Sequence, residues 1–336
     1  MPQRKNQHYV PKFFFRRFSL DGRSISVLNK VDGRVVPTAS IKTQASKDWF
    51  YGKSGVEDDL CEAEGVCGDV LRRLAAERSP RRLDPDHYSD LLAWLCLQHS
   101  RTEAARHASY PMFETLSRLY ADIGAEIDGS CADGNPLSDE VGAHVLQMEA
   151  AVSAAQSIGD LRPLFLENRT TRPFIFGDAP VVFHNLYYGK VKLRGVLGYR
   201  TPGLLISYPL GPRLSLMLVD DAAYKVRRAT EDRVLVKDLN DVAALNKLQI
   251  HAALRCVYFE SNQFSDYVKH LWQQEKGVLA HPAGTVNWGT CVVGNGKESL
   301  GEVVHFFQPL LSYKPRLSFL NHDVLDDAQF RNHVRG

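Results

Sequence analysis

Five short, mostly apolar runs between Leu164 and Leu218 constrain the fold of this chain more than any other feature. They cover residues 164–166, 174–176, 181–183, 204–206 and 214–218. Apolar runs of this length, bounded by polar and turn-forming residues, are typical of strands that are buried on both faces of a sheet. We therefore expect a buried sheet in this part of the chain.

A second strand-forming region lies near the N-terminus. Residues 24–30 alternate like a strand, Asp32 and Gly33 form a dipeptide typical of hairpin turns, and residues 34–36 resume a strand pattern. The segment 48–52 ends this region. The pattern predicts a small antiparallel sheet.

The chain between these two regions has a helical period. A first helix is predicted from Val56 to the Ser-Pro dipeptide at 79–80, because apolar residues recur at helical spacing. Asp84 and Pro85 are a cap and first-turn pair, and the helix that they open is expected to run toward Arg106. Further helices are predicted over 111–127, from Ser138 to about residue 158, over 241–258 and over 264–274, with a hairpin turn at 295–296.

No repeat, low-complexity tract or linker divides the chain. We therefore predict a single α+β domain over residues 1–336, in which the N-terminal and C-terminal parts form a mixed or antiparallel sheet around a central helical segment. Within it, residues 1–55 hold the N-terminal motif and the small sheet, 56–160 the helices, and 161–336 the remaining sheet and the C-terminal helices.

Composition narrows the class of protein. The 336 residues carry a net charge of +2, which is too balanced to require a nucleic-acid or membrane partner. Six cysteines include no C-x-x-C pair, so we interpret them as reduced, mostly buried thiols of a cytoplasmic protein. The chain lacks an apolar run of the ~18 residues that a membrane span needs, and we expect neither export nor membrane insertion.

The first twenty residues are locally basic. They contain no acid, Tyr9 and four phenylalanines lie among the cations, and the cations are Arg4, Lys5, Lys12, Arg16 and Arg17. Basic residues interleaved with aromatic ones can contact phosphates and stack on bases, which makes a nucleic acid or nucleotide a candidate partner. The alternative interpretation places the phenylalanines in the core and the arginines at its rim.

The same stretch contains a polar group ahead of a proline, formed by Gln7, His8 and Tyr9. His8 is the candidate general acid or base, because imidazole titrates near neutral pH without help. Gln7 and Tyr9 are candidates to orient His8 or a substrate. Alternatively, His8 is an ordinary histidine that anchors the N-terminal strand through hydrogen bonds.

The segment Gln7-His8-Tyr9-Val10-Pro11, with the aromatic run and Arg16-Arg17-Phe18-Ser19, resembles the start of the bacterial family named domain of unknown function 4238. Further motifs follow in the order of that family, covering about residues 6–260: they lie at 48–51, at Leu60 with Glu64, and at 98–102, 174–181, 208–212 and 245–246. The chain departs from the family at Gly177 and Ala179, where Ser/Thr and Asn are commoner. It departs again at residues 14–15, where Phe-Phe replaces the more usual Tyr-Leu.

The resemblance implies a cytoplasmic bacterial protein without an established activity. Some members are associated with defence against bacteriophages, so the resemblance implies an effector that is toxic or that acts on nucleic acid.

Three motif residues far apart in the sequence are candidates for the same site as His8. Arg101 shares a helix face with Gln98 and Thr102, and a guanidinium there can bind phosphate or carboxylate, or pair with an acid such as Glu64 between packed helices. Asp178 follows a buried strand, where site residues are common, although an Asp in such a turn also bonds backbone amides. Asn246 is a weaker ligand-binding candidate that can instead satisfy buried backbone.

No metal or cofactor site is predicted. The chain has no phosphate-binding loop of the GxxxxGK[ST] type, no H-E-x-x-H and no nucleophile elbow, and the acids at 57–59 resemble the charge bias of a helix N-terminus. We therefore expect metal-independent chemistry.

The leading hypothesis is an anti-phage effector, such as a nuclease or a nucleotide-processing hydrolase, that acts on RNA or a nucleotide by acid–base chemistry. His8, Tyr9, Arg101 and Asp178 would carry the catalysis, with Gln7, Gln98, Thr102 and Asn246 binding the ligand. The alternatives are a non-enzymatic sensor that uses the same pocket, and a protein in which these residues form a structural network.

Overall fold

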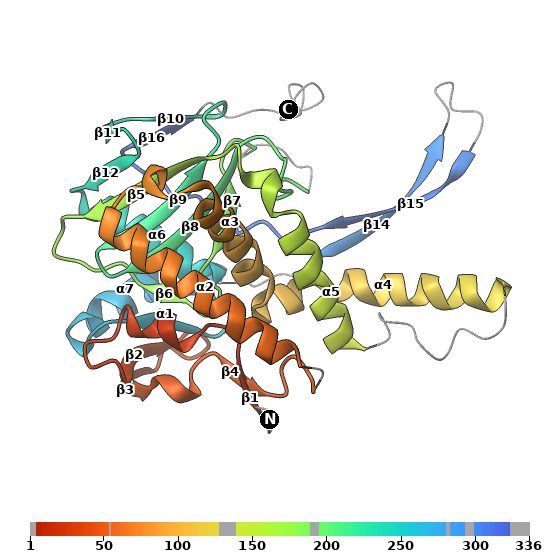
Figure 1. Ribbon diagram of the computed structural model, residues 1–336, viewed down its shortest axis with the longest axis horizontal. Coiled ribbons are helices and arrows are strands. Elements are labelled where there is room, and N and C mark those ends of the chain that lie inside the picture. The colour runs from red at the N-terminus through yellow and green to blue at the C-terminus, as the bar shows by residue number, and fades with distance from the viewer. Residues whose placement is uncertain are drawn as a thin grey trace.

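The computed structural model describes residues 5–53, 55–127, 139–188, 195–279, 283–292 and 299–322. Figure 1 shows a central sheet with helices on both faces, from which one long helix and one hairpin project. Helices and a mixed sheet combine in one chain, so the predicted α+β class is confirmed.

The largest sheet has six strands in the order β11-β12-β5-β9-β8-β7. Only the β12–β5 pair is parallel among these neighbours, which makes the sheet mixed. All eight residues of β8 are buried, as the continuous apolar run predicted. The strands are β5 (Arg162–Asn168), β7 (Val182–Asn185), β8 (Leu204–Gly211), β9 (Leu214–Val219), β11 (Ala229–Thr230) and β12 (Arg233–Val236).

The two faces of this sheet meet different helices because successive strand residues point to opposite sides. Phe165 and Leu216 join the core that α2 (Val56–Glu77) and α3 (Pro85–Ser100) cover. Leu164 and Met217 join the core on the other face, which α6 (Leu239–Ala252) covers. The sheet is thus the middle layer of the molecule (Figure 1).

A second sheet joins the N-terminal and C-terminal halves of the chain. Its order is β3-β2-β13-β6, with all neighbours antiparallel, so N-terminal strands pair with strands from the C-terminal half as predicted. The Asp32-Gly33 turn is confirmed: Gly33 has φ 72°, and a Cβ there would meet the Trp272 ring. The strands are β2 (Ser24–Asn29), β3 (Val35–Ser40), β6 (Phe176–Gly177) and β13 (Cys256–Phe259), with α7 (Ser265–Glu275) packed alongside.

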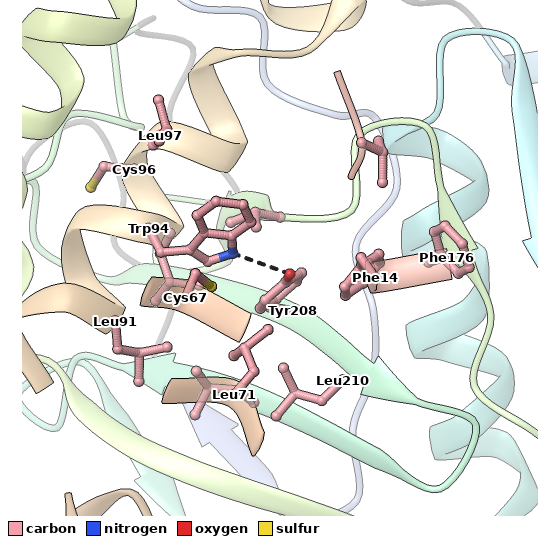
Figure 2. Close-up of a cluster of buried hydrophobic side chains, with 14 of the residues drawn as sticks. Phe14, Cys67, Leu71, Leu91, Trp94, Cys96, Leu97, Phe176, Tyr208 and Leu210 are labelled. Carbon is pink, nitrogen blue, oxygen red and sulfur yellow. Dashed lines mark hydrogen bonds between the residues drawn. The ribbon is translucent and has the colours of Figure 1, made fainter. Parts of the chain in front are cut away.

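The aromatic run of the N-terminus lies in the core. Helix α1 (Lys12–Arg16) buries Phe14, which stacks on Tyr208 with ring centres 5.0 Å apart and meets Phe176 edge-on. Figure 2 shows Phe14 and Phe176 beside Tyr208, which accepts a hydrogen bond from Trp94 Nε1 at 3.2 Å. The buried rings cannot stack on bases, as the interpretation of these phenylalanines as core residues required.

The predicted helical segment exists, but one of its boundaries was wrong. Helix α3 ends at Ser100 instead of running toward Arg106, and α4 (Glu103–Ile127) begins well before Pro111, which lies inside it. Thr102 explains the new start, since its Oγ1 accepts from Ala105 N at 3.2 Å, which is N-cap geometry. Helix α5 (Glu140–Ser153) is capped by Asp139, and the predicted cap Ser138 is outside the described residues.

The helix predicted over 241–258 was also wrong at its end. Helix α6 stops at Ala252, and Cys256–Phe259 is strand β13 in the middle of the second sheet. The side chain of Asp178 accepts hydrogen bonds from the backbone N–H groups of residues 254–256, which directs the chain away from the helix. Tertiary contacts thus outweigh the local helical pattern there.

Short elements complete the described chain. The expected C-terminal hairpin is formed by β14 (Thr285–Val292) and β15 (Ser299–Phe307), and its turn at 295–296 is outside the described residues. None of the described helices is long and apolar enough to cross a membrane. The others are β1 (Asn6–His8) paired with β4 (Ser46–Asp48), β10 (Tyr224–Val226) paired with β16 (Leu320–His322), and the 3-10 turns η1 (Ile41–Thr43), η2 (Pro80–Arg82), η3 (Ala155–Ile158), η4 (Asn262–Phe264) and η5 (Lys276–Val278).

Candidate functional site

The side-chain amide of Gln7 forms hydrogen bonds with backbone groups. From strand β1 its Oε1 accepts from Tyr51 N at 2.6 Å, and its Nε2 donates to the Gly52 carbonyl at 2.9 Å. Both ends of the amide are therefore committed to the turn after β4, and the predicted ligand-binding role of Gln7 stays a prediction.

His8 is buried beside Arg101. Its carbonyl accepts from Arg101 Nη2 at 2.7 Å, while its ring Nε2 has no partner among the described residues. Burial lowers the pKa of His8 to about 4, and the positive charges of Lys12 and Arg101 also lower it. At neutral pH the ring is consequently uncharged.

Arg101 is fully buried at the junction of α3 and α4. Its Nη2 also donates to Glu64 Oε1 at 2.9 Å, and its Nε donates to Tyr51 Oη at 3.1 Å. Burial alone would lower the pKa of Arg101. The charge interactions and hydrogen bonds with Tyr51 and Glu64 outweigh burial, so the pKa of Arg101 is raised. The guanidinium thus joins α2 and the end of α3 to strand β1. Its ion pair with Glu64 is the one that the alternative interpretation described.

Gln98 and Tyr9 extend this cluster. Gln98 Nε2 donates to the Tyr9 carbonyl at 3.0 Å, and Tyr9 Oη donates to Glu103 Oε2 at 3.4 Å. Burial, followed by the charges of Asp178 and Glu103, raises the pKa of Tyr9. Tyr9 is therefore a neutral phenol between the Arg101 cluster and Asp178.

Asp178 holds the start of β13. Its two oxygens accept from the backbone N–H groups of Leu254, Arg255 and Cys256 at 2.7, 2.8 and 3.0 Å. Burial raises the pKa of Asp178 to about 6 against the effect of these hydrogen bonds. The Asp178 side chain therefore fixes the backbone of Arg255, from which the guanidinium side chain extends.

Asn246 lies apart from the other candidates. Its Oδ1 accepts from Ile175 N at 3.0 Å, and its Nδ2 donates to the Pro173 carbonyl at 2.9 Å and to Tyr267 Oη at 3.1 Å. These contacts are those of an amide that satisfies buried backbone. The structure thus brings His8, Tyr9 and Arg101 together, places Asp178 near Tyr9, and puts Asn246 elsewhere.

The buried motif residues support an open cleft. We call it the Glu103 cleft; it has a volume of about 460 Å³ and is lined by Val31, Lys47, Phe50, Glu103, Arg106, His107, Tyr110, Glu140, Leu254 and Arg255. The buried Tyr9 donates a hydrogen bond to the lining residue Glu103, and Asp178 accepts hydrogen bonds from the backbone of the lining residues Leu254 and Arg255. The volume falls in the range of ordinary ligand sites, about 300–1,000 Å³.

Charge is concentrated in this cleft. Glu103 Oε1 accepts from Lys47 Nζ at 2.7 Å and from Arg255 Nε and Nη2 at 2.9 and 2.7 Å. Burial would raise the pKa of Glu103, but these donors outweigh it and lower that pKa, so Glu103 is a carboxylate. Two cations share one anion here, which leaves an excess of positive charge.

Arg106 and His107 add to the cleft from α4. The Arg106 guanidinium lies 3.8 Å from the centre of the Phe50 ring and 3.9 Å from Glu140 Oε1. Glu103 and His107 are four residues apart, so they share one face of the helix. Two carboxylates, an imidazole and three cations therefore line one opening.

The basic N-terminal residues divide in two groups. Lys5 pairs with Asp48 at 3.0 Å, and Arg17 Nε donates to the Leu210 carbonyl at 2.7 Å, so both have partners within the fold. Lys12 and Arg16 are exposed on α1, and Arg4 is outside the described residues.

The sequence did not single out Glu103, Lys47, His107 or Arg255. The only local signal is the spacing of Glu103 and His107 on a helix that follows the Thr102 cap. Among the described residues, no group of three or more His, Cys, Asp or Glu side chains is placed to hold a metal ion. The acids at 57–59 occupy the first turn of α2, where the helix dipole favours them.

Comparison with known proteins agrees with the motifs. A family described as Protein of unknown function (DUF4238) matches residues 6–263, which include every element that contributes a side chain to the Glu103 cleft. No curated protein and no solved structure matches the chain. The match spans most of the sequence, and the chain belongs to the DUF4238 family.

Proposed function

We propose that this protein binds the phosphate of a nucleotide or of RNA in the Glu103 cleft. The observation that carries the proposal is the convergence of Lys47 and Arg255 on Glu103 from segments that lie 56 and 152 residues away in the chain. The side chains of these two cations are 45% and 57% exposed, against 10% for Glu103. A phosphate can therefore reach the cations from solvent while the carboxylate stays beneath them.

Donor geometry supports an anionic ligand. Lys47 donates one of its three N–H groups to Glu103, and Arg255 donates from Nε and Nη2. The other N–H groups of Lys47 and the Nη1 group of Arg255 can therefore donate to a ligand. Arginine and lysine are the side chains that most often bind phosphate, and hydrogen bonds between charged groups are about twice as strong as neutral ones. Glu103 acts as a positioning residue that holds both cations in place.

Acid–base chemistry without a metal fits the same cleft. An imidazole is the side chain best suited to move a proton at neutral pH, and His107 lines the cleft one helical turn from Glu103. In this proposal Lys47 and Arg255 hold the phosphate and His107 transfers the proton. The buried His8, Tyr9, Arg101 and Asp178 then support the cleft.

One observation favours the sensor alternative. Glu103 is held as a carboxylate by Lys47 and Arg255, and a carboxylate that is stabilised by two cations is a weak proton acceptor. A site of this kind suits binding without turnover. Turnover of the ligand therefore separates enzyme from sensor.

The cellular role rests on the family. We propose that the protein is a cytoplasmic bacterial effector of defence against bacteriophages, as the family resemblance implies. Its test is the plating efficiency of phages on cells that carry the wild-type protein or the Arg255→Gln variant. Protection by the wild type and loss of protection in the variant are expected. Equal plating in both strains, with equal protein levels, would argue against this role.

Calorimetric titration with adenosine 5′-monophosphate and with a single-stranded RNA oligonucleotide tests binding. Arg255→Gln and Lys47→Gln are each expected to weaken binding about tenfold or more, since a hydrogen bond to a charged group is worth about 1.5–3 kcal/mol. Arg72→Gln is the matched control, because Arg72 is an exposed arginine that pairs with Asp69 on α2. Equal affinity for all three variants would overturn the proposal.

Turnover is tested with the same ligands over long incubations. His107→Gln should abolish any hydrolysis while it preserves binding, because a positioned general acid or base contributes about 10²–10⁴-fold in rate. Binding without hydrolysis by the wild-type protein would identify the sensor. Hydrolysis that persists in His107→Gln would exclude His107 as the proton-transfer group.

A further inference from the structure

A second pocket lies on the opposite face of α4. Its lining includes His99, Thr102, Ala108, Gln147, Phe306 and Gln308, and we call it the His99 pocket. At 100° per residue, Ala105 and Ala108 face away from Glu103 and His107, so one helix separates the pocket from the Glu103 cleft. The pocket has a volume of about 80 Å³ and opens beside a hollow of about 360 Å³ that shares His99, Gln147 and Phe306.

His99 presents an acceptor to this pocket. Its ring stacks on Phe183 with centres 4.1 Å apart, and its Nδ1 lies 3.0 Å from the Val181 carbonyl. A carbonyl can only accept, so Nδ1 carries the hydrogen and Nε2 carries the lone pair. Burial lowers the pKa of His99, which keeps the ring neutral.

Gln147 supplies the complementary group. Its amide lies 2.7 Å from Ser109 Oγ, whose single hydrogen is also within reach of the Ala105 carbonyl at 2.8 Å. Even if the amide donates one N–H to Ser109 Oγ, a second N–H donor is left for another acceptor. The described residues that line the pocket and its hollow include no Lys, Arg, Asp or Glu. A charged ligand would lose its hydration there without compensation, so an uncharged ligand fits.

We propose that the His99 pocket binds a small uncharged heterocycle that carries an N–H donor next to a carbonyl acceptor, as the free pyrimidine bases do. The N–H donates to His99 Nε2, and the carbonyl accepts from Gln147. At about 10–15 Å³ for each water-sized group, 80 Å³ accommodates ~5–8 heavy atoms, which is one ring. The proposal is independent of phosphate binding in the Glu103 cleft, because the two sites share no lining residue with which to recognise a ligand.

Uracil is the probe, and 1,3-dimethyluracil, which lacks both N–H groups, is the matched control ligand. Ligand-observed NMR on the full chain should detect uracil binding and at least a tenfold weaker binding of the dimethyl compound. Gln147→Leu should weaken uracil binding about tenfold, and Ala108→Leu should abolish it by filling the pocket. Ala121→Leu, an exposed position on the same helix, should bind uracil like the wild type.

Melting temperatures show whether each variant is folded. If Ala108→Leu unfolds, the affinity of Gln147→Leu for uracil and the affinity of the wild type for 1,3-dimethyluracil still test the proposal. The proposal is overturned if uracil does not bind at millimolar concentration, if both ligands bind equally, or if folded Ala108→Leu binds uracil normally.

Discussion

Replacing Arg101 by Met tests whether the buried motif is a support or a catalytic centre. The change removes the donors to the His8 carbonyl, Glu64 and Tyr51 from a fully buried position. Breaking a buried ion pair from one side costs about 3–5 kcal/mol, and since Glu64 retains 23% exposure and can be rehydrated, we expect the lower part of this range.

The melting temperature follows from this free energy. An unfolding entropy of about 2.1 cal/mol/K per residue gives ~0.7 kcal/mol/K for 336 residues, so a loss of about 3–4 kcal/mol should lower the melting temperature of Arg101→Met by about 4–6 °C. Urea denaturation measures the free energy of unfolding directly. Adding Glu64→Leu removes the unpaired acid and should recover about 1–3 kcal/mol of the loss.

A different result would refute this reasoning. If Arg101→Met keeps the free energy of unfolding within about 1 kcal/mol of the wild type and yet loses ligand binding or protection against phage, Arg101 acts on the ligand. The hypothesis that His8, Tyr9, Arg101 and Asp178 form the catalytic site would then be favoured.

Three further predictions concern the core, the pH dependence and the metal requirement. Phe14→Ala should destabilise the protein by about 3–5 kcal/mol in urea denaturation, and the half-buried Phe13→Ala by clearly less; equal losses would contradict the packing of α1. Burial lowers the pKa of His184 from 6.5 to about 3, so the unfolded chain binds its proton first as the pH falls, and stability present above pH 6.5 is lost below it. Between pH 7.5 and 5 the free energy of unfolding of the wild type should therefore fall by about 2 kcal/mol more than that of His184→Leu. Other titrating groups such as Asp178 contribute equally to both proteins, so their effects cancel in this difference. Parallel curves of unfolding free energy against pH for the two proteins would contradict the prediction. Binding of adenosine 5′-monophosphate should survive the chelator EDTA, and a loss that magnesium restores would show that the site needs a metal.

Much of the fold is readable from local patterns. Strands β5, β8 and β9 were predicted because strands buried on both faces need continuous apolar runs, and the turn at Gly33 because a left-handed backbone favours glycine. The break between α3 and α4 was missed because residues 98–106 contain no glycine or proline to mark the end of a helix. Thr102, the cap of the second helix, is the signal that marks the break.

Strand β13 shows the limit of local patterns. Residues 256–259 continue the apolar spacing of α6. They form a strand because the Asp178 carboxylate accepts hydrogen bonds from the backbone at 254–256 and because β2 pairs with them. Such partners lie far away in the sequence, so periodicity alone cannot reveal them.

The candidate site divides in the same way. The motif residues Tyr9 and Asp178 were recognisable, and they lie directly beneath the Glu103 cleft. The ion pairs of Glu103 with Lys47 and Arg255 join three distant segments and leave no common pattern in the sequence. Charged residues are also the commonest surface residues, so nothing marked these three before the fold brought them together.

A crystal structure of the protein soaked with adenosine 5′-monophosphate tests the central claim most directly. We predict density for the phosphate within hydrogen-bonding distance of Lys47 Nζ and the Arg255 guanidinium, with Glu103 still bound to both. The account is contradicted if the nucleotide occupies a site formed by other residues, or if the cleft stays empty at a concentration that saturates binding in solution.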